Sequence, residues 1–155
     1  LDDRGTTAVV TSGTLTNAAI FADIGPFRDE LFIDLVDTEY CLRARRAGYR
    51  IVGACDANLV HRIGATRTMS VLGIRVVATH HAPVRRYYLF RNSTVLMREY
   101  RDGYPHWIIY LGLVLGQNLL GAILLEPRKF ATLRACALGI YDGIRRKLGP
   151  AQHEF

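Results

Sequence analysis

The chain has 155 residues, 50% of them hydrophobic and 22% charged, so it is long enough for one ordinary hydrophobic core and too short for two. Its three cysteines show no CxxC spacing, which argues against a disulfide framework or a zinc site and indicates a reducing compartment. The net charge of +6 is uneven: residues 1–60 hold six arginines and nine acids, whereas residues 61–155 hold fourteen Lys or Arg and five acids. A basic half of this kind indicates contact with phosphates or with an anionic membrane surface.

Short strands and turns are predicted for much of the first half. Residues 8–11 are predicted to form a strand, which ends at the Ser-Gly pair that follows. Residues 15–21 are predicted to form either a helix or a second strand. Residues 49–54 and 58–63 read as two further extended pieces.

The clearest helix signal of the first half lies in residues 37–47. Small and apolar side chains recur there at helical spacing, namely Tyr40, Cys41, Ala44 and Ala47. A carboxylate, Asp34 or Asp37, stands where it can cap the N-terminus, and Gly48 stands at the C′ position. The sequence therefore predicts a helix that starts in an acidic cluster.

Helices are predicted for most of the second half. Residues 67–83 read as a loop with one strand, 74–79, before a proline boundary. Residues 84–101 read as a basic amphipathic helix, and residues 130–148 as a second amphipathic helix. Between them, residues 107–125 are nineteen residues without a charge.

This uncharged stretch has several interpretations. Its length is at the lower limit for crossing a bilayer, and its Gln-Asn pair and three glycines weaken that interpretation. The alternatives are a buried core or dimer helix, a re-entrant helix, and a helix attached to the membrane surface. We favour peripheral attachment, with basic and aromatic side chains at the lipid headgroups. The residues expected to make this membrane or phosphate contact are Arg85, Arg86, Arg91 and Trp107.

Residues 27–64 carry a dense set of motifs. They are Phe27-x-x-Glu30-Leu31-Phe32-Ile33-Asp34-Leu35-Val36-Asp37-Thr38-Glu39-Tyr40-Cys41-Leu42-Arg43, Ala47-Gly48-Tyr49 and His61-x-x-Gly64. Further motifs flank this set, namely Thr11-Ser12-Gly13, Ile24-Gly25-x-Phe27 and Arg86-x-Tyr88-x-x-x-Arg91-Asn92. Together they resemble the C-terminal half of the catalytic domain of family 2 inverting glycosyltransferases. The resemblance is closest to bacterial rhamnosyltransferases that act on polysaccharide or lipopolysaccharide precursors.

The resemblance implies roles for individual acids. Where this sequence has Val36-Asp37, the family has two acids, the second of which is the general base. Asp37 would then remove the proton of the acceptor hydroxyl while the anomeric carbon is attacked from the face opposite the nucleotide. Because Val36 replaces the first acid, Glu39 is implied as a supporting acid. The implied acceptor-binding residues are Ser12, Gly13 and Asp34.

A metal ligand and a missing segment are also implied. His61 would help to hold a divalent cation, Mg²⁺ or Mn²⁺, that offsets charge on the leaving nucleotide diphosphate. The family's Asp-x-Asp metal motif lies N-terminal to the Ser-Gly segment, and this sequence has no Asp-x-Asp. Since the sequence starts at Leu1 without a signal-like segment, we expect it to begin inside a longer protein. We therefore expect the nucleotide-binding half to be missing and the chain alone to be inactive.

The implied fold class is α/β, the C-terminal part of a GT-A (nucleotide-diphospho-sugar transferase) fold followed by amphipathic and apolar helices. Residues 1–83 would be the acceptor-side part of the catalytic domain, and residues 84–155 a helical, basic, membrane-proximal region. We expect a cytoplasmic location, peripheral at the inner face of the plasma membrane, and a homo-oligomer is a further expectation.

The predicted function is transfer of a sugar, rhamnose from dTDP-rhamnose, to a polysaccharide or lipid-linked glycan acceptor with inversion. The alternative is a non-catalytic basic module that binds an anionic membrane surface or nucleic acid. Nucleic acid is not expected as a partner, because the aromatic residues cluster in apolar runs and no recognition motif occurs. An Asp-x-Asp motif after a strand, upstream of residue 1, would distinguish the enzyme from the binding module.

Overall fold

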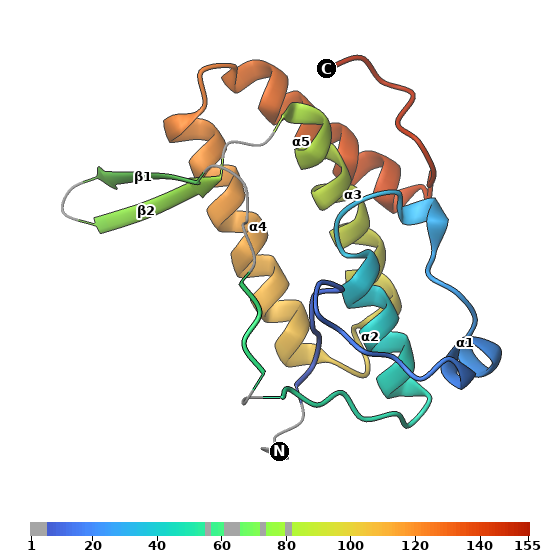
Figure 1. Cartoon of the computed structure of the whole chain (residues 1–155). Helices are drawn as coiled ribbons and strands as arrows, with labels where there is room; N and C mark the ends of the chain where they lie inside the picture. Colours follow the sequence, from blue (N-terminus) through green and yellow to red (C-terminus); the bar gives the residue numbers. More distant parts are fainter. Residues whose placement is uncertain (1–5, 55–56, 61–65, 72–73, 80–81) are drawn as a thin grey trace.

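The computed structural model describes residues 6–54, 57–60, 66–71, 74–79 and 82–155. Its elements are α1 (Ala19–Ile24), the 3-10 helix η1 (Asp29–Leu31), α2 (Val36–Arg46), β1 (Thr66–Val71), β2 (Ile74–Thr79), α3 (Pro83–Tyr100), α4 (Pro105–Leu125) and α5 (Lys129–Ile144). Figure 1 shows α3 and α5 side by side, with α2 against the end of α3 that leads into α4.

Glycines let α5 approach α3 closely. A Cβ atom at Gly143 would lie 2.7 Å from the carbonyl oxygen of Arg91, and one at Gly139 would lie 3.1 Å from the Arg91 backbone nitrogen. No side chain therefore separates the two helix backbones at these positions. Tyr87 and Ala135 are buried in this interface, which makes α3 and α5 the most tightly packed pair of helices.

The main hydrophobic cluster attaches α2 to α3. Its buried members are Leu31, Leu42, Val95, Leu96 and Tyr100. Fully burying one leucine side chain contributes roughly 1.5–3 kcal/mol, so Leu42 alone is a substantial anchor for α2. The orientation of α2 is thereby fixed relative to α3.

The four predicted long helices are confirmed, with ends that shift by a few residues. Gly48 follows α2 with a φ of 92° and occupies the predicted C′ position. The predicted capping is wrong, because the N-cap residue is Leu35 and no side chain caps the helix. Of the segment 15–21, only its end belongs to a helix, α1.

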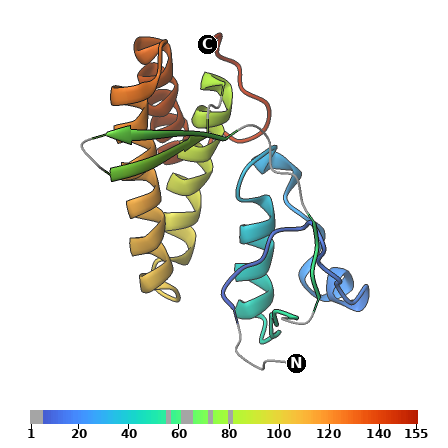
Figure 2. The same cartoon turned by 60° about the vertical axis from the view of Figure 1, so that its left-hand side comes forward.

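The α/β fold class is not confirmed, because the residues that the structure describes form a single small sheet. Its strands pair antiparallel from Thr66↔Thr79 to Val71↔Ile74. The hairpin extends outward past α4 in Figure 1 and lies in front of the helices in Figure 2, where this side is turned forward. The strand predicted at 74–79 is thus confirmed, and its partner β1 was not predicted. Residues 8–11 form no strand, and within 49–54 Val52 forms only an isolated bridge, because a strand needs a continuous backbone ladder. The chain just before residue 8 contacts 49–54 through the hydrogen bond from Thr6 N–H to Ile51 O at 3.1 Å.

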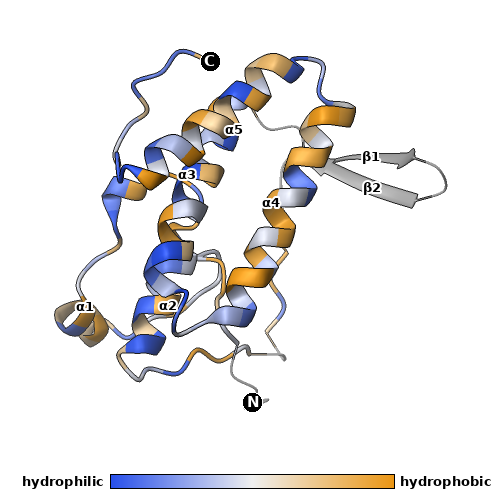
Figure 3. Cartoon of the chain, turned by 180° about the vertical axis from the view of Figure 1, so that it is seen from behind, coloured by the Kyte–Doolittle hydropathy of each residue, from blue (hydrophilic) through white to orange (hydrophobic). Residues whose placement is uncertain are grey.

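Helix α4 leaves most of its apolar surface uncovered. Leu111 and Ala122 are buried against the other helices, whereas Ile109, Leu113 and Leu120 on the opposite side are more than half exposed. Figure 3 shows hydrophobic residues along the whole length of α4. By length and composition, residues 105–124 are sufficient to cross a membrane.

A pair of glycine-to-alanine variants tests the close contact of α3 and α5. We expect Gly139→Ala to lower the free energy of unfolding by about 1–3 kcal/mol, because its methyl group would overlap the α3 backbone. Gly121→Ala is the matched control, since it lies on α4 with open space around the new atom and should be neutral or slightly stabilising. Urea denaturation followed by circular dichroism measures both, and equal effects at the two positions would contradict the packing.

Candidate functional site

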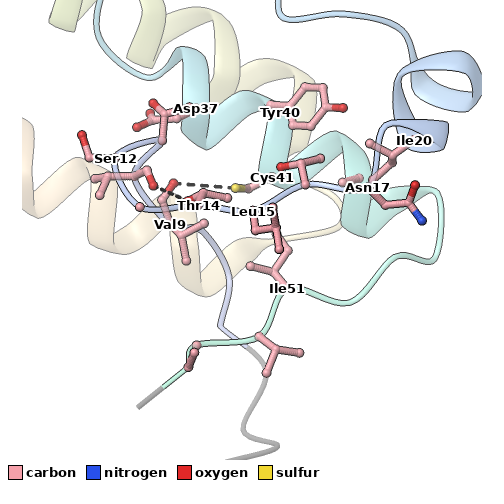
Figure 4. Close-up of a pocket in the computed structure, with 18 of the residues that line it drawn as sticks. Val9, Ser12, Thr14, Leu15, Asn17, Ile20, Asp37, Tyr40, Cys41 and Ile51 are labelled. Atoms are coloured by element: carbon pink, nitrogen blue, oxygen red, sulfur yellow. Dashed lines mark hydrogen bonds between the residues drawn. The ribbon is translucent and has the colours of Figure 1, made fainter. Parts of the chain in front are cut away.

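A pocket of about 950 Å³ lies between α2 and two irregular segments of the chain. The segments are residues 9–17 and residues 49–54 with 57–59, and α2 contributes Asp37, Tyr40, Cys41 and Ala44. In Figure 4, the side chains of Asp37 and Cys41 extend from the face of α2 that lies next to a loop. This loop contains Val9, Ser12 and Thr14. The pocket therefore combines one rigid helical wall with two loop walls.

Helical spacing explains which α2 residues line the pocket. Asp37, Cys41 and Ala44 are separated by four and then three residues, so they share one face of the helix. The Cys41 thiol lies 3.8 Å from the carbonyl oxygen of Val9 and holds the loop against this face. Burial raises the pKa of Cys41, and the charge of Asp37 raises it further, so the thiol stays protonated at neutral pH.

Asp37 is the acid that faces this pocket. It is half-buried in the first turn of α2, where the helix dipole favours a negative charge. Its Oδ1 atom accepts a hydrogen bond of 2.8 Å from the backbone N–H of Thr38. A carboxylate held in this way beside a pocket is suited to accept a proton from a bound hydroxyl group.

Ser12 and Gly13 lie in the same pocket as Asp37. Gly13 has a φ of 77°, which favours glycine, and a Cβ atom there would lie 2.8 Å from Cδ2 of Leu59. The structure thus brings together three of the residues singled out in the sequence, from a loop and a helix start that are separate in the chain.

Asp34 lies elsewhere and does not line this pocket. Its carboxylate forms an ion pair with Arg85, with Nη2 of the arginine 3.0 Å from Oδ1. The pair joins the start of α3 to the segment before α2. Arg85 is still 47% exposed, so of the three arginines expected at a phosphate or membrane surface it is the one that reaches solvent.

Glu39 points away from the pocket. Two helical positions amount to a rotation of about 200°, which carries Glu39 to the side of α2 that faces α3. Its side chain is 1% exposed and accepts hydrogen bonds from Tyr100 Oη at 2.9 Å and from Nε and Nη2 of Arg43 at 3.1 Å. The geometry therefore gives Glu39 a structural role, in place of the predicted role as supporting acid.

Arg86 and Arg91 are buried, so their predicted contact with lipid headgroups or phosphate is wrong. Arg86 is 3% exposed and donates to the backbone and side-chain oxygens of Asn118 at 2.9 and 3.0 Å, and to Glu126 at 3.1 Å. Arg91 is 0% exposed. The physical reason is the central place of α3, on which these two arginines face neighbouring segments of the chain. Trp107 is half-buried and packs against the main hydrophobic cluster, and its contact with a membrane stays a prediction.

The segment that leads into α2 has an unusual backbone. Phe32, Asp34 and Leu35 have φ values of 65°, 63° and 64°, a region that costs a non-glycine residue roughly 1–2 kcal/mol. Sequence reasoning missed the residue that holds this segment, Asn92, which is 0% exposed on α3. The sequence did contain a signal for Asn92, namely the Arg91-Asn92 pair in the motif that starts at Arg86. No role of its own was predicted for this pair.

A metal site is not formed by the residues that the structure describes. No group of three or more His, Cys, Asp or Glu side chains comes together among them. His61, the predicted metal ligand, lies outside the described residues. The described part of the chain therefore does not provide a complete cation site.

Comparison with known proteins gives one informative similarity. No protein-family model and no solved structure matches the chain. Over 90 residues the chain is 40% identical to the dTDP-rhamnosyl transferase RfbF of Shigella flexneri, a match that covers 58% of this chain and 29% of that protein. The chain thus spans less than a third of the length of this relative. The predicted resemblance to rhamnosyltransferases is confirmed by this similarity.

The different surroundings of the two α2 acids predict different consequences of neutralising them. We expect Glu39→Gln to lower the free energy of unfolding by about 1–3 kcal/mol, because it removes the charge that pairs with Arg43 inside the protein. Glu154→Gln, at an exposed position, is the control and should change stability by less than about 0.5 kcal/mol. Chemical denaturation measures both variants. Full stability of Glu39→Gln would contradict its structural role.

Proposed function

We propose that the protein carrying this chain is an inverting glycosyltransferase that moves rhamnose from dTDP-rhamnose to a polysaccharide or lipid-linked glycan. The sequence similarity to a dTDP-rhamnosyl transferase supports the donor and the reaction class. The observation that carries the chemistry is the position of Asp37, a half-buried carboxylate at the start of a helix and beside the pocket of about 950 Å³.

The proposed reaction is a single displacement. An alcohol is a poor nucleophile, so the Asp37 carboxylate takes the proton of the acceptor hydroxyl as its oxygen attacks the anomeric carbon. The bond from that carbon to the diphosphate breaks, the nucleotide diphosphate leaves with the electron pair, and the configuration inverts. A base of this kind contributes roughly 10²–10⁴-fold to the rate. Ser12 and Gly13 line the same pocket and are proposed to contact the acceptor.

We also propose that the whole protein has a GT-A fold. A hydrogen bond from Thr6 N–H to Ile51 O joins the segments that contain these residues, and the described residues of the two segments form no strand. In the proposed fold, they join strands supplied by other residues of the full protein. The boundary at residue 83 between catalytic and helical regions remains a proposal, and so does a Mg²⁺ or Mn²⁺ ion with His61 among its ligands.

A basic module that binds nucleic acid is not favoured. The positive charge of the second half gave that alternative its support, and two of its arginines, Arg86 and Arg91, are buried. Arg86 donates to Asn118 and Glu126 and Arg91 donates to backbone carbonyls, and their burial keeps both guanidinium groups away from phosphates.

Peripheral attachment to the inner face of the plasma membrane is proposed through α4. The exposed side chains of Ile109, Leu113, Leu120 and Leu124 recur at intervals of four or seven residues and form one apolar stripe. Exposed Arg128, Lys129 and Phe130 follow at its C-terminal end. Basic residues beside an apolar stripe suit an anionic bilayer surface, where a lipid-linked acceptor would be reached. A homo-oligomer stays a prediction.

The first test of function uses the full native protein that contains this sequence. Asp37→Asn is expected to lower rhamnose transfer from dTDP-rhamnose at least about 10²-fold, because the amide cannot accept the proton. The affinity for dTDP-rhamnose should stay within about twofold, since the base acts on the acceptor. Asp102→Asn, an exposed acid in the turn between α3 and α4, is the matched control and should retain full activity. Near wild-type turnover of Asp37→Asn would show that another group is the base.

Vesicle flotation tests the membrane proposal. The full native protein should float with vesicles that contain phosphatidylglycerol, and a Leu113→Glu and Leu120→Glu double variant should lose at least about 10²-fold in binding, since each leucine contributes roughly 1.5–3 kcal/mol when buried. Val60→Glu, at an exposed apolar position outside α4, should bind like the wild type. Equal binding of all three proteins would exclude α4 as the contact surface.

A further inference from the structure

The segment from Leu31 to Leu35 determines where α2 begins. The N–H of Glu39 donates to the carbonyl oxygen of Leu35 at 2.8 Å, which is the first backbone hydrogen bond of the helix. Leu35 itself has left-handed backbone geometry, with a φ of 64°. Asp37 follows two residues later, so the direction of its side chain depends on the conformation of this segment.

Asn92 contacts this segment at several points. Its Nδ2 atom lies 2.9 Å from the carbonyl oxygen of Leu31 and 2.8 Å from those of Ile33 and Asp34. These carbonyls belong to an irregular stretch in which Phe32, Asp34 and Leu35 have positive φ values. The two hydrogens of one buried amide group are thus shared among three carbonyl oxygens of this stretch.

Arg91 orients Asn92 and extends the contact. Its Nε–H donates to Oδ1 of Asn92 at 3.0 Å, and because an arginine can only donate, the Nδ2 group of Asn92 must face the segment. Its Nη2 donates to the carbonyl oxygen of Leu31 at 3.0 Å, and its Nη1 to that of Gly149 at 2.5 Å. Both side chains are 0% exposed, so water does not compete for these bonds.

We propose that Asn92, oriented by Arg91, is a positioning residue for Asp37. By holding residues 31–35, in which Phe32, Asp34 and Leu35 have positive φ values, it fixes the start of α2 and directs the Asp37 carboxylate towards the pocket. This inference rests on the proposed function of Asp37 as the base. It assigns a role in catalysis to a buried side chain on α3 that does not touch the pocket.

The test compares Asn92→Asp with the same substitution at Asn118 in the full native protein. Asn92→Asp keeps the size of the side chain and turns a carboxylate oxygen towards the carbonyl oxygens, which removes the donors. Asn118→Asp is the matched control, because Asn118 lies on α4 and its side-chain oxygen already accepts from Arg86. Asn92→Ser, too short to reach the segment, gives the same comparison without a new charge, in case the aspartate variant does not fold.

Two readouts separate this inference from the proposed function. Hydrogen exchange of the backbone amides of residues 32–39 should accelerate about tenfold in the Asn92 variants, with α5 unchanged, and should not accelerate in Asn118→Asp. In rhamnose transfer, kcat should fall roughly 10²-fold while the KM for dTDP-rhamnose stays within about twofold, since a misaimed base affects the chemical step.

The outcomes are distinct. Unchanged exchange in residues 32–39 would overturn the proposal, and so would faster exchange with unchanged kcat. A wild-type protein that does not use dTDP-rhamnose would remove the proposed function, and the exchange experiment would still decide whether Asn92 holds the segment.

Discussion

The buried pair Arg91 and Asn92 is the constraint on which the rest of the described structure depends. A guanidinium group in the protein interior is costly unless its donors are used. Here the donors reach the backbone carbonyls of Leu31 and Gly149, and so connect the centre of α3 with two distant parts of the chain. The rings of Tyr87 and Tyr88 lie 5.6 and 4.8 Å from the guanidinium carbon and add cation–π contacts. Helix α3 therefore organises the molecule through polar contacts as well as hydrophobic ones.

Because α3 lies in the centre of the structure, its charged residues are not all exposed to solvent. A helix with arginines on several sides usually has a solvated face, and a lipid surface is a natural partner for it. In this protein Arg86 and Arg91 of α3 make internal contacts, while Arg85, Arg98 and much of the uncharged helix α4 remain exposed. The net charge of the second half consequently overstates the positive charge at the molecular surface.

The helices were predictable from the sequence because they depend on local spacing, whereas Asp37 was singled out through the resemblance to a family motif. The period of α2 places Asp37 and Cys41 on one face, and the same period could have shown that Glu39 lies on the other. The strands at 8–11 and 49–54 were mispredicted because a strand is defined by its neighbour, which a local pattern does not reveal. Burial of Arg91 depends likewise on Leu31 and Gly149, which are far from it in sequence.

The contacts of Gly149 have a consequence for the order of folding. Its carbonyl oxygen accepts from Arg91, and its N–H donates to the carbonyl oxygen of Glu30 at 2.6 Å, so it closes the structure around the segment before α2. Ala151 continues this connection through a hydrogen bond of 2.7 Å to Tyr88. During synthesis, residue 149 leaves the ribosome long after α2 has emerged. The helix that carries Asp37 can form early. The orientation of the Asp37 side chain is fixed only after this late part of the chain has been synthesised and has packed against the segment before α2.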